Sequence, residues 1–187
     1  MKKILSVFMC FLLLFSFSIS SVYALSVEEQ AGEQLKGLGL YKGYEDGTLG
    51  LNKNITRAEF AALAVRIEGL DDKQEANKGT TPFKDVSGNH WASGYINIAS
   101  SKELIKGFED KTFKPEEQIT YAQALAVVIR ILGYEKDVTG TWPNNYINKA
   151  KDLGLDKNMN LSPNTPINRG QIAVIVSNAL NVKIAVK

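Results

Sequence analysis

The sequence contains almost no cysteine or histidine. Its 187 residues include one cysteine, Cys10, and one histidine, His90. Cys10 lies in an apolar N-terminal run, so disulfides and thiol chemistry are excluded for the rest of the chain. His90 has no cysteine or second histidine with which to hold zinc, and no G-x-S-x-G, phosphate-loop or paired-histidine motif occurs. The sequence therefore predicts no catalytic residue, no metal site and no cofactor.

Long hydrophobic runs are also missing after residue 24. Lys2 and Lys3 precede the apolar residues 4–19, and Val22-Tyr23-Ala24 offers a cleavage point before Leu25. The apolar run is shorter than the roughly 20 residues that a membrane-spanning helix requires. We therefore predict a signal peptide over residues 1–24 and an exported chain with no membrane span after cleavage. An uncleaved membrane anchor is the alternative.

The chain has no marked excess of charge of one sign. It carries 22 basic and 20 acidic residues, and the two numbers become equal without Lys2 and Lys3 of the predicted signal peptide. A general polyanion-binding surface requires a strongly basic face. Nucleic acid is therefore not an expected partner.

A helix-start pattern occurs three times, at residues 55–59, 119–123 and 167–171. In each copy Thr or Asn is followed three positions later by Glu or Gln, which is the signature of a capping box. Apolar residues then recur at helical spacing. Each unit has one apolar helix that it cannot bury alone. We therefore predict a mainly α fold of three tandem helix-loop-helix repeats in a pseudo-threefold arrangement around a central helix bundle.

The residue after each predicted cap is Arg57, Tyr121 or Arg169, and the next residue is small. A helix N-terminus favours an anion through its free amides and its dipole, and arginine offers forked hydrogen bonds to a carboxylate or phosphate. Arg57 and Arg169 are therefore candidate anion-binding residues. The alternative is a surface arginine beside a good cap, which contributes little.

A second helix is predicted before each of these helices, and in two repeats it carries a tryptophan, a tyrosine and an alanine at successive intervals of four residues. Trp91 and Trp142 each precede a tyrosine by four residues. Such a tryptophan either packs against the neighbouring helix or offers a flat face to a sugar ring. Arg66 and Arg130, which are 64 positions apart within the predicted apolar helices, are interpreted as structural or solvent-facing.

Four motifs in the middle of the chain resemble the S-layer homology (SLH) domain family. They are Phe83-Lys84-Asp85-Val86, His90-Trp91-Ala92, residues 107–115 and Ile119-Thr120. The resemblance covers essentially all of the chain after residue 24, as repeats over residues 25–80, 81–134 and 135–187. The first repeat is shortened at its N-terminus.

The resemblance implies a bacterial surface protein that binds cell-wall polysaccharide non-covalently in grooves between repeats. The expected partner is an acidic polysaccharide attached to peptidoglycan, often pyruvylated, and the expected location is the cell wall and S-layer. Tyr121 stands in place of the usual basic residue, so one groove is expected to be weakened or lost. The predicted glycan-binding residues are Arg57, Arg169, Thr56, Ala58, Glu59, Asn168, Gly170, Trp91, Trp142 and Tyr121.

Two other functions stay open at this point. The same fold could serve as a surface protein-protein adaptor or structural module, with a non-covalent protein partner and no glycan. A glycan-cleaving enzyme would need two carboxylates facing each other across a groove, and no spacing in the sequence singles out such a pair. The three repeats fill the chain after the predicted signal peptide, so no passenger domain is expected.

Overall fold

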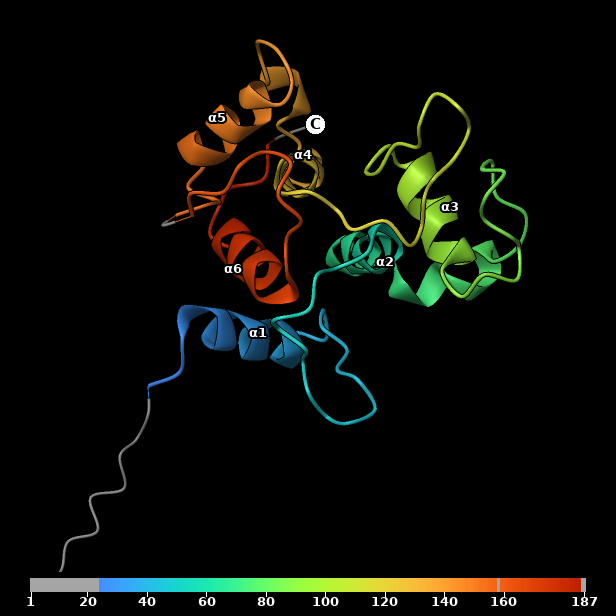
Figure 1. The fold of residues 1–187 in the computed structure, drawn as a ribbon, viewed down its shortest axis with the longest axis horizontal. Coiled ribbons are helices and arrows are strands. Elements are labelled where there is room, and N and C mark those ends of the chain that lie inside the picture. Colours follow the sequence, from blue (N-terminus) through green and yellow to red (C-terminus); the bar gives the residue numbers. More distant parts are fainter. Residues whose placement is uncertain (1–23, 158, 186–187) are drawn as a thin grey trace, which may run out of the picture.

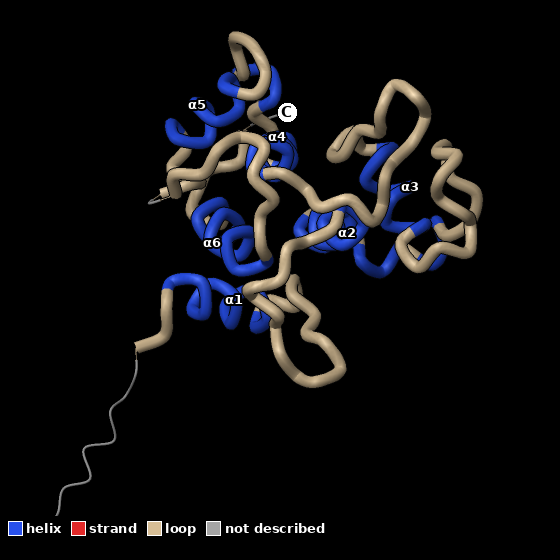
Figure 2. The backbone as a smooth tube through the Cα atoms, in the orientation of Figure 1, coloured by secondary structure: helices blue, strands red, loops and turns tan. Residues whose placement is uncertain are grey.

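The computed structural model describes residues 24–157 and 159–185, and it is mainly helical, as predicted. The predicted signal peptide lies outside the described residues except for Ala24. The α-helices are α1 (Val27–Gly37), α2 (Arg57–Ile67), α3 (Ser93–Ser101), α4 (Tyr121–Ile131), α5 (Asn144–Asp152) and α6 (Arg169–Ala179). Short 3-10 helices cover Asp71–Lys73 (η1), Glu75–Asn77 (η2) and Glu135–Asp137 (η3). Loops form most of the remainder (Figure 2).

The predicted helix starts are confirmed at all three positions. Thr56, Thr120 and Asn168 are the N-caps of α2, α4 and α6, and each completes a capping box with the Glu or Gln three residues later. A fourth capping box, from Ser26 to Glu29, begins α1. In the part of the chain that is described, no helix is long and apolar enough to cross a membrane.

Helix packing joins each repeat to the next one. α2 packs on α3, α4 packs on α5, and α6 packs on α1 (Figure 1). The second helix of each sequence repeat therefore has the first helix of the following repeat as its main partner. The contact between α6 and α1 brings the last repeat back to the first. The packed unit consequently contains helices from two different repeats.

Three isoleucines that precede the N-caps are joined by a closed triangle of backbone hydrogen bonds. The amide of Ile55 donates to the carbonyl of Ile167 (3.2 Å), Ile167 donates to Ile119 (3.1 Å), and Ile119 donates to Ile55 (3.1 Å). All three residues are buried. The triangle fixes the starts of α2, α4 and α6 beside one another and supports the pseudo-threefold arrangement, which stays a prediction.

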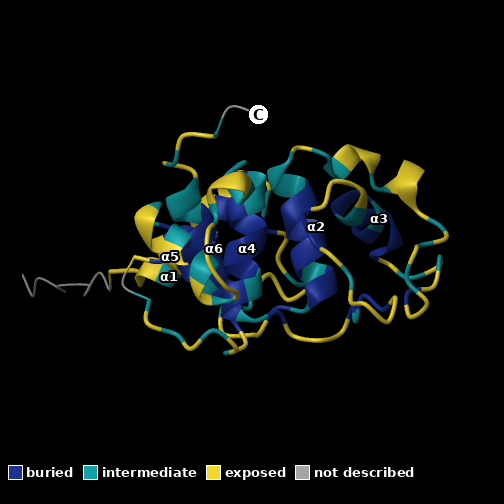
Figure 3. Cartoon of the chain, turned by 90° about the horizontal axis from the view of Figure 1, so that it is seen from above, coloured by how far each residue is buried: buried dark blue, intermediate teal, exposed yellow. Residues whose placement is uncertain are grey.

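The apolar residues of α2, α4 and α6 form about half of the buried core (Figure 3). α4 contacts both α2 and α6. Near their C-terminal ends, all three helices contribute residues to the lining of one hollow. The central helices are therefore tied together at their N-termini and surround a space near their C-termini.

This arrangement makes a single repeat incomplete. A fragment of residues 82–134 contains α3 and α4 but lacks α2 and α5, the helices on which they pack. We expect the fragment to show no cooperative thermal transition, because both apolar faces lose their partners. Far-ultraviolet circular dichroism during heating measures this, with the full chain as control. A cooperative transition of the fragment would contradict the shared core.

Candidate functional site

Two hollows of similar size lie between neighbouring repeats. The hollow that we call the first groove has a volume of about 140 Å³, and the second groove has a volume of about 150 Å³. The first groove is lined by Lys42, Gly43, Tyr44, Glu59, Ala62, Arg66, Trp91 and Arg169. The second groove is lined by Arg57, Ile105, Lys106, Phe108, Ile119, Gln123, Ala126, Val127, Arg130 and Trp142.

The two grooves are built from matching positions of successive repeats. Each has an arginine from a helix start, an arginine from a helix interior, a lysine and an aromatic residue from a loop, and a tryptophan. The matched pairs are Arg169 with Arg57, Arg66 with Arg130, Lys42 with Lys106, Tyr44 with Phe108, Glu59 with Gln123, Ala62 with Ala126, and Trp91 with Trp142. The chain therefore contains the same kind of site twice.

Arg57 lines the second groove and is only 4% exposed. Its Nε donates to the carbonyl of Phe113 (2.7 Å), and Nη2 donates to the carbonyl of Lys106 (3.1 Å). The guanidinium carbon lies 4.8 Å from the ring centroid of Phe108 and 4.9 Å from that of Phe113. The side chain is therefore fixed by both hydrogen bonds and cation-π contacts.

Arg169 has the same environment in the first groove and is 8% exposed. Its Nε donates to the carbonyl of Leu49 (2.8 Å), and Nη2 donates to the carbonyl of Lys42 (3.2 Å). Its guanidinium carbon lies 4.7 Å from the ring centroid of Tyr41 and 5.2 Å from that of Tyr44. The interpretation of these arginines as loose surface residues is therefore wrong.

Each of these two guanidinium groups retains donors for a ligand. Arginine has five N–H donors, and the contacts to loop carbonyls use two of them in Arg57 and two in Arg169. Burial lowers the pKa of Arg57, and the carboxylates of Glu117 and Asp85 oppose this shift. An arginine stays protonated despite such a shift, so each groove holds a fixed positive charge.

The helix N-terminal amides do not take part in an anion site as the sequence suggested. The amide of Arg57 donates to the carbonyl of Glu117 (2.8 Å), and the amide of Ala58 donates to the carbonyl of Pro115 (3.0 Å). The same pattern joins Tyr121 to Thr165, Ala122 to Pro163, Arg169 to Lys53, and Gly170 to Leu51. Loop backbone from the adjoining repeat therefore satisfies these donors.

Several predicted site residues act in the framework of the grooves. Thr56 and Asn168 are caps, and the amides of Ala58 and Gly170 donate to carbonyls of the adjoining loops. A Cβ at Gly170 would lie 2.8 Å from a carboxylate oxygen of Glu28, so a larger residue here would displace the Glu28 side chain. Of the predicted cap residues, Glu59 alone lines the first groove.

Both tryptophans pack against a neighbouring tyrosine and stay half exposed, and the stacking of a sugar ring on them stays a prediction. Trp91 is 50% exposed and Trp142 is 52% exposed. Each packs edge-on against a tyrosine of the next helix turn, with ring centroids 6.4 Å apart for Tyr95 and 5.5 Å apart for Tyr146. Each tryptophan is therefore positioned by packing and still offers apolar surface to its groove.

Arg66 and Arg130 line the grooves as well, which the sequence reading did not anticipate. Nε of Arg66 lies 3.1 Å from Oδ1 of Asp71, and the hydroxyl of Tyr95 donates to the same oxygen (2.8 Å). Arg130 repeats this network with Glu135 and Tyr146. The repeated sequence signal is an acidic residue five positions after each arginine, whereas the tyrosines follow the acidic residues by different distances, 24 and 11 positions.

The remaining interface between repeats lacks these groups. Tyr121 occupies the position of the two groove arginines, is buried, and donates its hydroxyl to Asp156. Val27 occupies the position of the two tryptophans. Each of these three residues lies eight positions before a helix residue whose carbonyl accepts an amide five positions later, namely Leu35, Ala99 or Ala150. No guanidinium or indole is therefore available at these positions of the third interface.

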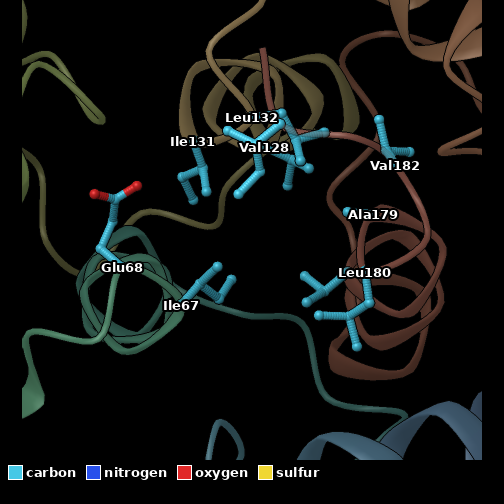
Figure 4. Close-up of a pocket in the computed structure, with 10 residues that line it drawn as sticks. Ile67, Glu68, Val128, Ile131, Leu132, Ala179, Leu180 and Val182 are labelled. Carbon is cyan, nitrogen blue, oxygen red and sulfur yellow. The ribbon is translucent and has the colours of Figure 1, made fainter. Parts of the chain in front are cut away.

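An additional hollow differs from the grooves in chemistry. It has a volume of about 450 Å³ and lies near the C-terminal ends of α2, α4 and α6 (Figure 4). Its lining consists of Ile67, Glu68, Val128, Ile131, Leu132, Val176, Ala179, Leu180, Val182 and Ile184. With one carboxylate and no cation, this hollow does not suit an acidic ligand.

The buried arginines should also contribute to stability. We expect Arg57→Lys and Arg169→Lys each to lower the free energy of unfolding by about 1–3 kcal/mol, because lysine cannot reproduce the forked bonds to two carbonyls. Urea denaturation measures the loss, with the exposed substitution Lys36→Arg as control. Unfolding free energies equal to that of the control would show that the guanidinium contacts do not hold the loops.

Comparison with known proteins identifies the family. The sequence profile of the S-layer homology domain matches residues 33–61, 82–125 and 136–173. The chain is 43% identical over 154 residues to the "Middle cell wall protein" of Brevibacillus brevis and 43% identical over 156 residues to the "Surface layer protein" of Brevibacillus choshinensis. It is 28% identical over 155 residues to the "Cellulosome-anchoring protein" of Acetivibrio thermocellus.

These alignments cover most of this chain and a smaller part of each relative. They include 82%, 83% and 74% of this chain, but only 14%, 14% and 35% of the three relatives in the same order. Since the profile covers more than half of the sequence in three successive segments, the chain belongs to the S-layer homology domain family of cell-wall-associated surface proteins.

Proposed function

We propose that this protein attaches to the bacterial cell surface by binding an acidic cell-wall polysaccharide non-covalently in the first and second grooves. The observation that carries the proposal is the fixed guanidinium of Arg57 or Arg169 beside a half-exposed tryptophan in each groove. An acidic sugar needs a cation for its carboxylate and a flat apolar face for its ring. Each groove offers both.

The finer proposal is that the carboxylate belongs to a pyruvate ketal on the glycan. A planar guanidinium with donors to spare can hold a carboxylate by two parallel hydrogen bonds. Trp91 or Trp142 would then stack on the C–H face of the sugar that carries the ketal. Lys42 and Lys106, which line the same grooves beside two arginines each, add a further positive charge. No catalytic step is part of this proposal.

The printed names of two relatives support an anchoring role. One is called a cell wall protein and another a cellulosome-anchoring protein. Because the chain spans about a seventh of the length of the Brevibacillus relatives, the proposal concerns attachment to the wall and not the remaining activities of those proteins.

A protein-protein adaptor is the second candidate function, and the apolar hollow near the ends of α2, α4 and α6 favours it. Leu180 and Ile184 are exposed large apolar residues on its lining. Such a surface suits a protein partner better than a charged sugar. The two functions can be distinguished by the chemistry of the material that the protein binds.

We expect the protein to co-sediment with isolated peptidoglycan sacculi and to lose this association when the acidic secondary polymer is extracted. The physical reason is that the grooves offer arginine and tryptophan to an acidic sugar. Centrifugation followed by gel analysis of pellet and supernatant measures the bound fraction. Sedimentation that is unchanged after extraction would favour the adaptor function.

Calorimetric titration tests the arginines directly. We expect Arg57→Ala and Arg169→Ala each to weaken binding in the altered groove by about 1.5–3 kcal/mol, or one to two decades in affinity, because a charged hydrogen bond is lost. The ligand is a purified acidic wall oligosaccharide. Trp142→Ala, which changes a half-exposed residue, provides a groove variant with little effect on the fold. Parental affinity in all of these folded variants would overturn the site assignment.

A further inference from the structure

The two grooves differ by one full charge at a pair of matched positions. Glu59 lines the first groove, and Gln123 lines the second. Both residues have the same structural task. Glu59 accepts the amide of Thr56 (2.8 Å), and Gln123 accepts the amide of Thr120 (3.2 Å), so each completes a capping box. The fold therefore accepts either residue, and the difference that remains is the negative charge.

The two grooves are alike in volume and in the number and type of the cations that line them, although Lys42 pairs with Asp71 (3.1 Å) and Lys106 forms no ion pair within 4.0 Å among the described residues. Their volumes are about 140 and 150 Å³, and each is lined by two arginines and one lysine. Each interior arginine is paired with one carboxylate, Asp71 in the first groove and Glu135 in the second. Glu59 is thus an additional carboxylate in the first groove with no counterpart in the second.

The carboxylate of Glu59 acts on other groups of the first groove. Burial raises the pKa of Tyr44, and the charge of Glu59 raises it further. Within residues 24–157 and 159–185, Glu59 forms no ion pair within 4.0 Å. Its charge therefore stays available to repel an anion that approaches Arg169.

The second groove also adjoins a larger charged hollow. It shares Lys106 and Arg130 with a space of about 460 Å³ that Lys102 and Lys136 help to line. The complete lining is Glu68, Lys102, Glu103, Leu104, Lys106, Arg130, Gly133, Glu135 and Lys136. At the positions of Lys102 and Lys136, the first groove's repeat has Leu38 and Asp72. The three carboxylates of this lining, Glu68, Glu103 and Glu135, oppose its four cations, so the ranking of the grooves rests on the difference between Glu59 and Gln123.

We propose, building on the proposed function, that the second groove is the principal site for the acidic glycan and that the charge difference between Glu59 and Gln123 ranks the two grooves. A like charge inside a groove of this size opposes a bound carboxylate over a few ångströms. The second groove should consequently bind the acidic ligand about tenfold more tightly than the first.

The sequence provides a separate reporter for each groove. Its two tryptophans are Trp91 in the first groove and Trp142 in the second. The indole N–H signals in a ¹H–¹⁵N correlation spectrum therefore follow binding at both grooves in one intact protein. Trp91→Phe and Trp142→Phe assign the two signals. The probe is a synthetic disaccharide with one pyruvate ketal, and the same disaccharide without the ketal is the control ligand.

We expect the Trp142 signal to reach half of its shift at about a tenfold lower probe concentration than the Trp91 signal. Glu59→Gln should tighten the titration at Trp91, and Gln123→Glu should weaken the titration at Trp142, each by about tenfold. Both substitutions keep a side-chain oxygen for the N-cap amide, so the helix starts stay capped. The control disaccharide should show no difference between the grooves.

The possible outcomes separate this inference from the function on which it rests. Equal titration of the two signals, or a Trp91 titration that Glu59→Gln leaves unchanged, overturns the ranking of the grooves while binding itself persists. If neither indole signal responds to the ketal-bearing probe, the proposed glycan function fails together with the inference.

Discussion

The structure depends on how the backbone amides at the starts of α2, α4 and α6 are satisfied. The first amides of a helix have no partner within the helix, and a buried unpaired amide is costly. Here the carbonyls of an adjoining repeat accept them, as Glu117 and Pro115 do for Arg57 and Ala58. This contact also brings the carbonyls of Lys106 and Phe113 to the guanidinium of Arg57. The second groove is therefore a consequence of joining two repeats, and one repeat alone has no such groove.

The third interface shows that this way of joining repeats does not require arginine. Tyr121 occupies the equivalent position and bonds to Asp156, and its amide is satisfied by the loop as in the other repeats. Burying a guanidinium carries a desolvation cost that a tyrosine largely avoids. The arginines are therefore not explained by stability alone, and their remaining donors give them a use that Tyr121 does not have. This comparison supports a ligand-binding role for Arg57 and Arg169.

Local patterns in the sequence predicted the parts of the structure that depend on local interactions. The capping boxes at Thr56, Thr120 and Asn168 and the helical apolar spacing correctly located three helices. The partners of the helix-start amides could not be predicted, because Glu117 lies far from Arg57 in the sequence. The groove roles of Arg66 and Arg130 were missed for the same reason, since they depend on packing between α2 or α4 and the helix of the next repeat.

The near balance of basic and acidic residues also conceals how charge is arranged. Over the whole chain, 22 basic and 20 acidic residues argue against a polyanion-binding surface. In the grooves, however, cations are fixed by carbonyls and aromatic rings, so little conformational entropy remains to be lost when they bind a carboxylate. A small number of such preorganised charges can select an acidic sugar without a basic surface. Local charge in the grooves, such as that of Glu59, therefore matters more for recognition than the net charge of the protein.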